Sequence, residues 1–138
     1  MPTTNPNLTF LRQYDTIPQI LKDKDLAALG DAYINLVHSL ALSKQSGRPC
    51  GKKVKGTVLA EALRKAGLRT LLPSRMDRHD LSDAAEALLA YAWLHTLVSL
   101  EENVDTLSKS DNLVSGLTKL LINSKERISL SKLSPIPC

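Results

Sequence analysis

Apolar residues recur along this chain at steps of three and four residues, and this spacing constrains the fold more than any other feature. Over residues 25–44 it marks the buried face of a long amphipathic helix, which Gly47 is positioned to end. No stretch alternates apolar and β-branched residues in the way that predicts a strand. We therefore expect an all-α fold. The apolar face of the long helix consists of Leu26, Leu29, Tyr33, Leu36, Val37, Leu40 and Ala41.

The chain has 138 residues, which suits a single domain. We expect an irregular arm at 1–15, one helical domain at 16–128 and a Pro- and Ser-containing tail at 129–138. After the long helix, capping residues and glycines predict four more helices. These are a helix at 58–66 capped by Thr57, one from Asp80 or Ser82 to about Val98, one at 99–108 capped by Ser99, and one from Ser110 or Asp111 to about Arg127.

Several function classes are excluded by the sequence. No apolar run reaches the roughly 20 residues of a membrane-spanning helix, and the first residues lack the basic-then-apolar order of a signal peptide. Cys50 and Cys138 have no neighbouring cysteine or histidine, so they form neither a disulfide framework nor a zinc motif. We expect a cytoplasmic protein that does not contact a membrane.

Positive charge is concentrated in one part of the chain. The formal net charge is +4, but residues 44–78 carry +8 and the remainder carries −4. A basic block of this kind attracts polyanions, of which nucleic acid is the commonest inside cells. A merely solvated surface is the alternative.

Three acidic residues lie in apolar helical surroundings. Asp83 and Glu86 are three residues apart, so both carboxylates lie on one helical face next to alanine and leucine. Asp31 begins a polar stripe with Asn35 and Ser39, a pattern typical of a hydrogen-bonding seam between helices. An unpaired carboxylate near a core is very unfavourable, so either Arg or Lys side chains or a divalent cation must neutralise these acids. Oxygen-only sites favour Mg²⁺ or Mn²⁺.

These residues resemble the catalytic core of the ribonuclease III family. The first half of the resemblance is Leu29-Gly30-Asp31-Ala32 followed by Asn35. The second half follows the basic stretch and consists of Asp83, Glu86, Ala87, Ala90, Trp93 and Leu94 at the family's approximate spacing. The resemblance covers roughly residues 25–100 and is closest to compact archaeal proteins of this kind.

The resemblance implies an all-helical, homodimeric endonuclease that cleaves double-stranded RNA with Mg²⁺ or Mn²⁺. Asp31, Asp83 and Glu86 would be the catalytic metal ligands, and Asn35 would support them. The two sites of a dimer would face a common valley, and each would cut one strand. No double-stranded-RNA-binding domain follows the core, so the nuclease domain itself would hold the RNA. The side chains expected to do so are Arg48, Lys52, Lys53, Lys55, Arg75 and Arg78.

The chain departs from the family pattern at two positions. Ala27 and Lys24 stand where the family commonly has glutamates, so a four-carboxylate site is reduced to three. Asp25 or Asp80 could supply a substitute carboxylate, and His79 could bond a carboxylate or contact RNA. A solvated position at a loop or helix end is the alternative for all three.

Two other functions remain open at this point. The first is an RNA-binding or scaffold protein that retains the fold but cleaves weakly or not at all, and Ala27 is the main argument for it. The second is a metal phosphohydrolase of the HD type, which would use a His79-Asp80 pair in a loop together with His38 and Asp105. We expect His38, His95, Tyr91 and Trp93 to be packing residues.

Overall fold

The computed structural model describes residues 8–133, and within this range it contains helices and no strand. The predicted all-α fold is therefore confirmed. No helix in this part of the chain is long and apolar enough to cross a membrane. The elements are α1 (Ile17–Leu21), α2 (Lys24–Ser46), α3 (Gly56–Lys65), the 3-10 helix η1 (Arg69–Leu71), α4 (Arg78–Leu94), α5 (Leu100–Ser108) and α6 (Leu113–Leu133).

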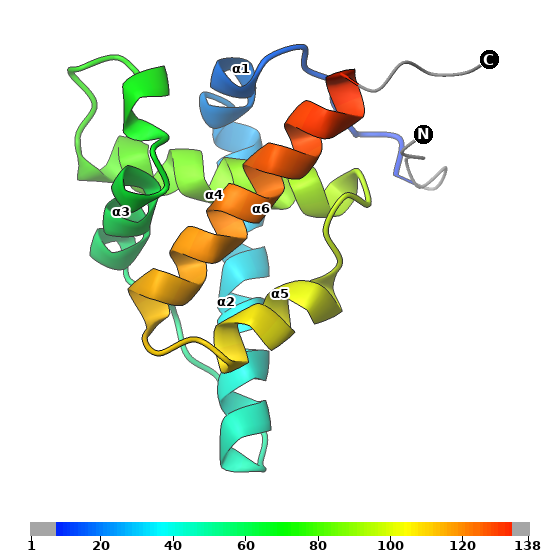
Figure 1. Ribbon diagram of the computed structural model, residues 1–138, viewed down its shortest axis with the longest axis vertical. Helices are drawn as coiled ribbons and strands as arrows, with labels where there is room; N and C mark the ends of the chain where they lie inside the picture. Colours follow the sequence, from blue (N-terminus) through cyan, green and yellow to red (C-terminus); the bar gives the residue numbers. More distant parts are fainter. Residues whose placement is uncertain (1–7, 134–138) are drawn as a thin grey trace.

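Helix α4 is the centre of the fold. It packs against α1, α2, α3 and α6, and in Figure 1 it lies between α2 behind it and α6 in front. Nearly every residue from Leu81 to Leu94 is buried, and alanines at five of these positions allow the neighbouring helices to approach closely. A helix that is apolar on all sides has to be buried in this way. The stretch also contains polar residues, and among them Glu86 is a buried acid in its middle.

Helices α2 and α4 cross at Gly30. A Cβ atom at Gly30 would lie only 2.0 Å from the carbonyl oxygen of Glu86, so no other residue fits without moving the helices apart. With 3.6 residues per turn, this contact separates two flanks of α2. The acidic flank carries Lys24, Asp31 and Asn35, and the apolar flank carries Leu29, Leu36 and Leu40. These three leucines were expected on the buried face of the helix, but they are exposed, because α4 and α5 cover only the side of α2 that carries Leu26, Tyr33 and Val37.

The long helix ends as predicted, but α4 begins and ends earlier than expected. Gly47 is the left-handed C-cap of α2, with φ of 77°. Helix α4 begins at Arg78 because Asp77 is its N-cap and forms a reciprocal capping box with Asp80. It ends at Leu94, before Thr96 takes a left-handed φ of 58°.

The boundaries of α3 and α6 also differ from the expected ones. Thr57 does not cap α3, because the carbonyl of Lys55 already accepts the first helical hydrogen bonds. Helix α6 begins at Leu113, directly after Asn112, whose Oδ1 atom accepts a bond from the Ser115 amide. Helix α6 continues to Leu133, and its Ile128 side chain is fully buried. Residues 129–133, expected in the tail, are therefore helical, and residues 134–138 lie outside the described range.

The described part of the expected arm is irregular and is fastened to the start of α2. The Asp23 carboxylate accepts bonds from Arg12 Nη1, from the Tyr14 hydroxyl at 2.7 Å and from the Leu26 amide at 3.0 Å. Asp23 is also the N-cap of α2, and its side chain is almost fully buried. This one carboxylate therefore fixes both the arm and the first turn of α2. Residues 1–7 of the expected arm lie outside the described range.

Substitution of Gly30 by alanine should destabilise the fold by about 3 kcal/mol, because the new methyl group would overlap the Glu86 backbone. Urea unfolding measures this difference. Gly51→Ala is the control, since a Cβ there meets nothing within 4 Å. A Gly30→Ala protein as stable as the control would contradict the close crossing.

Candidate active site

The structure brings the predicted acidic residues of α2 and α4 together. Asp31 lies one residue beyond the helix crossing, and its carboxyl is near enough to Glu86 to raise the pKa of that side chain. Asp83 precedes Glu86 by one turn of α4 and is close enough to act on it electrostatically. Asp31 is exposed, Asp83 is half-buried and Glu86 is buried. Their roles as metal ligands remain a prediction.

Glu86 has an excess of negative charge around it. Burial, together with the carboxyls of Asp31 and Asp83, raises the pKa of Glu86 from 4.5 to about 8. Within the described residues, no Lys or Arg forms an ion pair with Asp31 or Glu86. At neutral pH the Glu86 carboxyl therefore holds a proton, which a divalent cation could displace.

Asp83 has a different partner. The Lys24 ammonium donates to Asp83 Oδ2 at 3.0 Å and to Asp80 Oδ1 at 3.0 Å, so it bridges two successive turns of α4. These bonds raise the pKa of Lys24, and the Lys24 contact lowers the pKa of Asp80. The sequence indicated that Arg or Lys side chains could neutralise the acids, but it did not identify Lys24 as the partner. The signal available was its position seven residues, or two turns, before Asp31.

The donor set partly fits a divalent cation. Among the side chains of the described residues, no group of three or more His, Cys, Asp or Glu is arranged to hold a metal ion. The Asp31–Glu86 pair nevertheless suits Mg²⁺, which proteins often hold through one or two carboxylates, with water and substrate phosphate completing its shell. Asp25 does not add a carboxylate, because it lies toward the other flank of α2 and pairs with Arg12.

Asn35 connects Asp31 to the basic loop between α2 and α3. Its Nδ2 atom donates to Asp31 Oδ1 at 3.3 Å, and its Oδ1 atom accepts from the Val54 amide at 2.8 Å. One turn further along α2, the Ser39 hydroxyl bonds both the amide and the carbonyl of Lys52. The polar stripe is thus a seam between a helix and a loop, and not the predicted seam between two helices.

This seam holds part of the basic block beside the acidic pair. Lys52, Lys53 and Lys55 are exposed on either side of Val54, whose amide is anchored by Asn35. Arg48 is exposed at the start of the same loop. Arg75 is exposed just before α4, and Arg78 is exposed at its first position, within two turns of Asp83. All six predicted basic residues are therefore accessible to a ligand.

The expected His79-Asp80 loop pair is instead part of a helix. Both residues lie in the first turn of α4, where Asp80 forms the capping box and contacts Lys24. His79 is exposed, and no hydrogen bond to the acidic residues is found for it in residues 8–133. His38 is buried, and Asp105 pairs with Lys44 and Lys109. These positions give no support to a phosphohydrolase of the HD type.

The aromatic residues pack as expected. The Tyr33 and Trp93 rings stack with centroids 4.5 Å apart, and the Tyr33 hydroxyl accepts a bond from Asn103. Tyr91 lies 4.1 Å from the His95 ring, and its hydroxyl accepts a bond from the Tyr14 amide. These contacts join α2 to α4 and α5, and they assign the rings a packing role.

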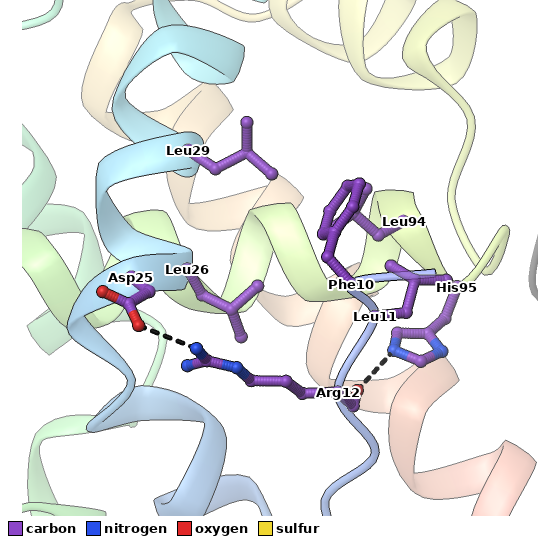
Figure 2. Close-up of a pocket in the computed structure, with 8 residues that line it drawn as sticks. All are labelled: Phe10, Leu11, Arg12, Asp25, Leu26, Leu29, Leu94 and His95. Atoms are coloured by element: carbon purple, nitrogen blue, oxygen red, sulfur yellow. Dashed lines mark hydrogen bonds and ion pairs between the residues drawn. The ribbon is translucent and has the colours of Figure 1, made fainter. Parts of the chain in front are cut away.

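A cavity of about 260 Å³ opens beside the apolar flank of α2. Figure 2 shows Phe10 from the arm facing Leu26 and Leu29 of α2 across this space. The Arg12–Asp25 ion pair lies at one end, and His95 bonds the Arg12 carbonyl nearby. Sequence analysis did not identify this cavity, because it depends on how the arm folds against α2 and α4.

The fold and the site together define an all-helical domain with paired carboxylates beside a basic loop. A family model described as Ribonuclease III matches residues 24–132, which include α2 to α5 and nearly all of α6. The chain therefore belongs to the ribonuclease III family, and the resemblance found in its sequence is confirmed. No curated protein sequence matches the chain significantly.

The charge state of Glu86 can be tested through stability. A raised pKa means that the folded state holds the proton more tightly than the unfolded state, so stability falls as pH rises from 4.5 to about 8. With a chelator present, the free energy of unfolding of the wild type should fall by on the order of 3 to 5 kcal/mol over this range, and Glu86→Gln should abolish this fall. The variant should match the wild type at pH 4.5 and exceed it at pH 8, as measured by urea unfolding.

The control is Glu61→Gln, at an exposed acid on α3. Its difference from the wild type should be small and similar at both pH values. If Glu86→Gln behaves in the same way, the carboxyl of Glu86 is not destabilised by its surroundings.

Proposed function

We propose that this protein is an endoribonuclease that cleaves double-stranded RNA with the help of Mg²⁺ or Mn²⁺. The observation that carries the proposal is the Asp31–Glu86 pair, which lacks a positive partner among the described residues and lies next to an accessible basic loop. The pair supplies a cation site, and the loop supplies phosphate contacts. Membership of the ribonuclease III family supports the same activity.

In this proposal, each part of the site has a separate task. Asp31 and Glu86 hold the cation, which when bound supplies charge stabilisation for the phosphate and an activated water. Asn35 keeps the Asp31 carboxylate oriented, because it is itself fixed to the Val54 amide. Lys52, Lys53 and Lys55 bind the RNA backbone near the acidic pair. A-form RNA is recognised mostly through its shape, phosphates and 2′-hydroxyls, so we expect little sequence preference.

A second function is favoured by the composition of the acidic flank. Ala27 contributes no carboxylate, and Lys24 occupies Asp83 with an ion pair. These two residues suit an RNA-binding protein that cleaves slowly or not at all. The same purified chain tests both candidates.

Cleavage is measured on a labelled RNA duplex and on the matching single strand, with Mg²⁺ and with chelator. The wild type should cut only the duplex and only with Mg²⁺. Asp31→Asn and Glu86→Gln should each slow single-turnover cleavage by about 100-fold or more, because each removes one of the two cation-holding carboxylates. Glu61→Gln is the matched control and should cleave at the wild-type rate. Duplex binding without cleavage would favour the second function.

We further propose that the active form is a homodimer joined through the apolar flank of α2. Leu29, Leu36 and Leu40 on this flank are exposed, although large apolar side chains on a monomer surface are usually scattered singly. Phe10 is 59% exposed and extends the patch toward the cavity shown in Figure 2. Because this flank faces away from Asp31, a partner there would leave the acidic pair open to RNA.

Leu36→Asp should convert the dimer to a monomer, since it would bury an unpaired charge in the proposed contact. Sedimentation equilibrium measures the change. Leu130→Asp introduces the same charge at an exposed leucine on α6 and should leave the dimer intact. A monomeric wild type, or a dimer that survives Leu36→Asp, would contradict this interface.

A further inference from the structure

We propose that the Lys24 ammonium is a built-in cation of the candidate active site. It occupies the place between Asp80 and Asp83, so that the site takes one divalent ion at Asp31 and Glu86 and no second ion. This inference rests on the proposed function, because it concerns the number of ions that the same site binds. It makes Lys24 a positioning residue, which acts through the carboxylates that it holds.

The contacts of Lys24 are those of a cation shared by two ligands. Its Nζ atom lies 3.0 Å from Asp80 Oδ1 and 3.0 Å from Asp83 Oδ2. The two carboxylates are three residues apart on one face of α4 and come from successive parts of its first two turns. Without Lys24, this face would present two adjacent negative charges beside Glu86. Lys24 offsets the repulsion between these charges.

The backbone places Lys24 for this task. Lys24 is the first residue of α2 and directly follows Asp23, whose carboxylate is bound by Arg12, Tyr14 and the Leu26 amide. The Asp23 side chain is only 2% exposed, so the start of α2 is fixed relative to the arm. The Lys24 side chain then leads from this fixed point to α4. The backbone of Lys24 is thus fixed by the cap at Asp23, and its exposed side chain is held at its tip by two carboxylates.

The other half of the site is built differently. Asp31 lies two turns after Lys24 on the same flank of α2, and it meets Glu86 near the helix crossing. In residues 8–133, neither carboxyl has an ion-pair partner from Lys or Arg. An ammonium has three N–H donors, and Lys24 uses one on each of its two acids. The third is left for water or a phosphate oxygen of a bound substrate.

The number of ions that the site binds can be measured by titrating the full chain with Mn²⁺, with electron paramagnetic resonance reporting the free ion. The wild type should bind one Mn²⁺. Lys24→Gln should bind a second ion at the released Asp80 and Asp83, and its first ion should bind about tenfold more tightly because a nearby positive charge is gone. Lys24→Arg keeps the charge and should behave like the wild type.

Lys22→Gln is the matched control, since it removes an exposed lysine two residues away, and it should also bind one ion as the wild type does. Two ions on the wild type, or a Lys24→Gln protein that binds Mn²⁺ as the wild type does, would overturn the inference while leaving the nuclease proposal intact. A wild type that binds no Mn²⁺ would overturn the proposed function and this inference together. The count does not depend on cleavage, so the two failures are distinguishable.

Discussion

The close contact between Gly30 of α2 and the backbone of Glu86 in α4 is the constraint on which the rest of the molecule depends. It sets the distance between the two helices that carry the acidic residues, and it fixes the side of α2 that faces α4. Asp31 follows Gly30 directly, so the same contact brings its carboxyl to Glu86. The apolar flank, with Leu29 and Leu36, is turned to the other side by the same geometry.

The electrostatics of the site follow from this packing. Because α4 is buried between α2 and α6, Glu86 is only 6% exposed, and next to Asp31 and Asp83 it retains a proton that a solvated glutamate would lose. Asp83 lies nearer to the N-terminus of α4, where Lys24 can reach it from the start of α2. The acidic residues therefore form two groups, one neutralised by a residue of the chain and one that is short of positive charge. That shortage is the physical basis for proposing a cation.

Local signals predicted much of this structure. The spacing of Leu26 to Ala41 predicted α2, Gly47 predicted its end, and the acids within apolar helices identified the side chains that now lie together. One error concerned a local signal: Asp77 and Asp80 form a capping box three residues apart, which sets the start of α4 and was not recognised in the sequence. The other errors occurred where a distant contact decides the outcome, and the length of α6 depends on burial of Ile128. The partner of Asn35 is a loop amide 19 residues away, which helical periodicity does not reveal.

The central claim is that the Asp31–Glu86 pair binds a divalent cation. The most direct test is a carboxyl-carbon NMR titration of Glu86 in the wild-type protein, with chelator and then with saturating Mg²⁺. The account predicts a pKa of about 8 in chelator, which Mg²⁺ lowers to below neutrality because the ion takes the place of the proton. A pKa that Mg²⁺ leaves unchanged, or one already in the ordinary range in chelator, would contradict it.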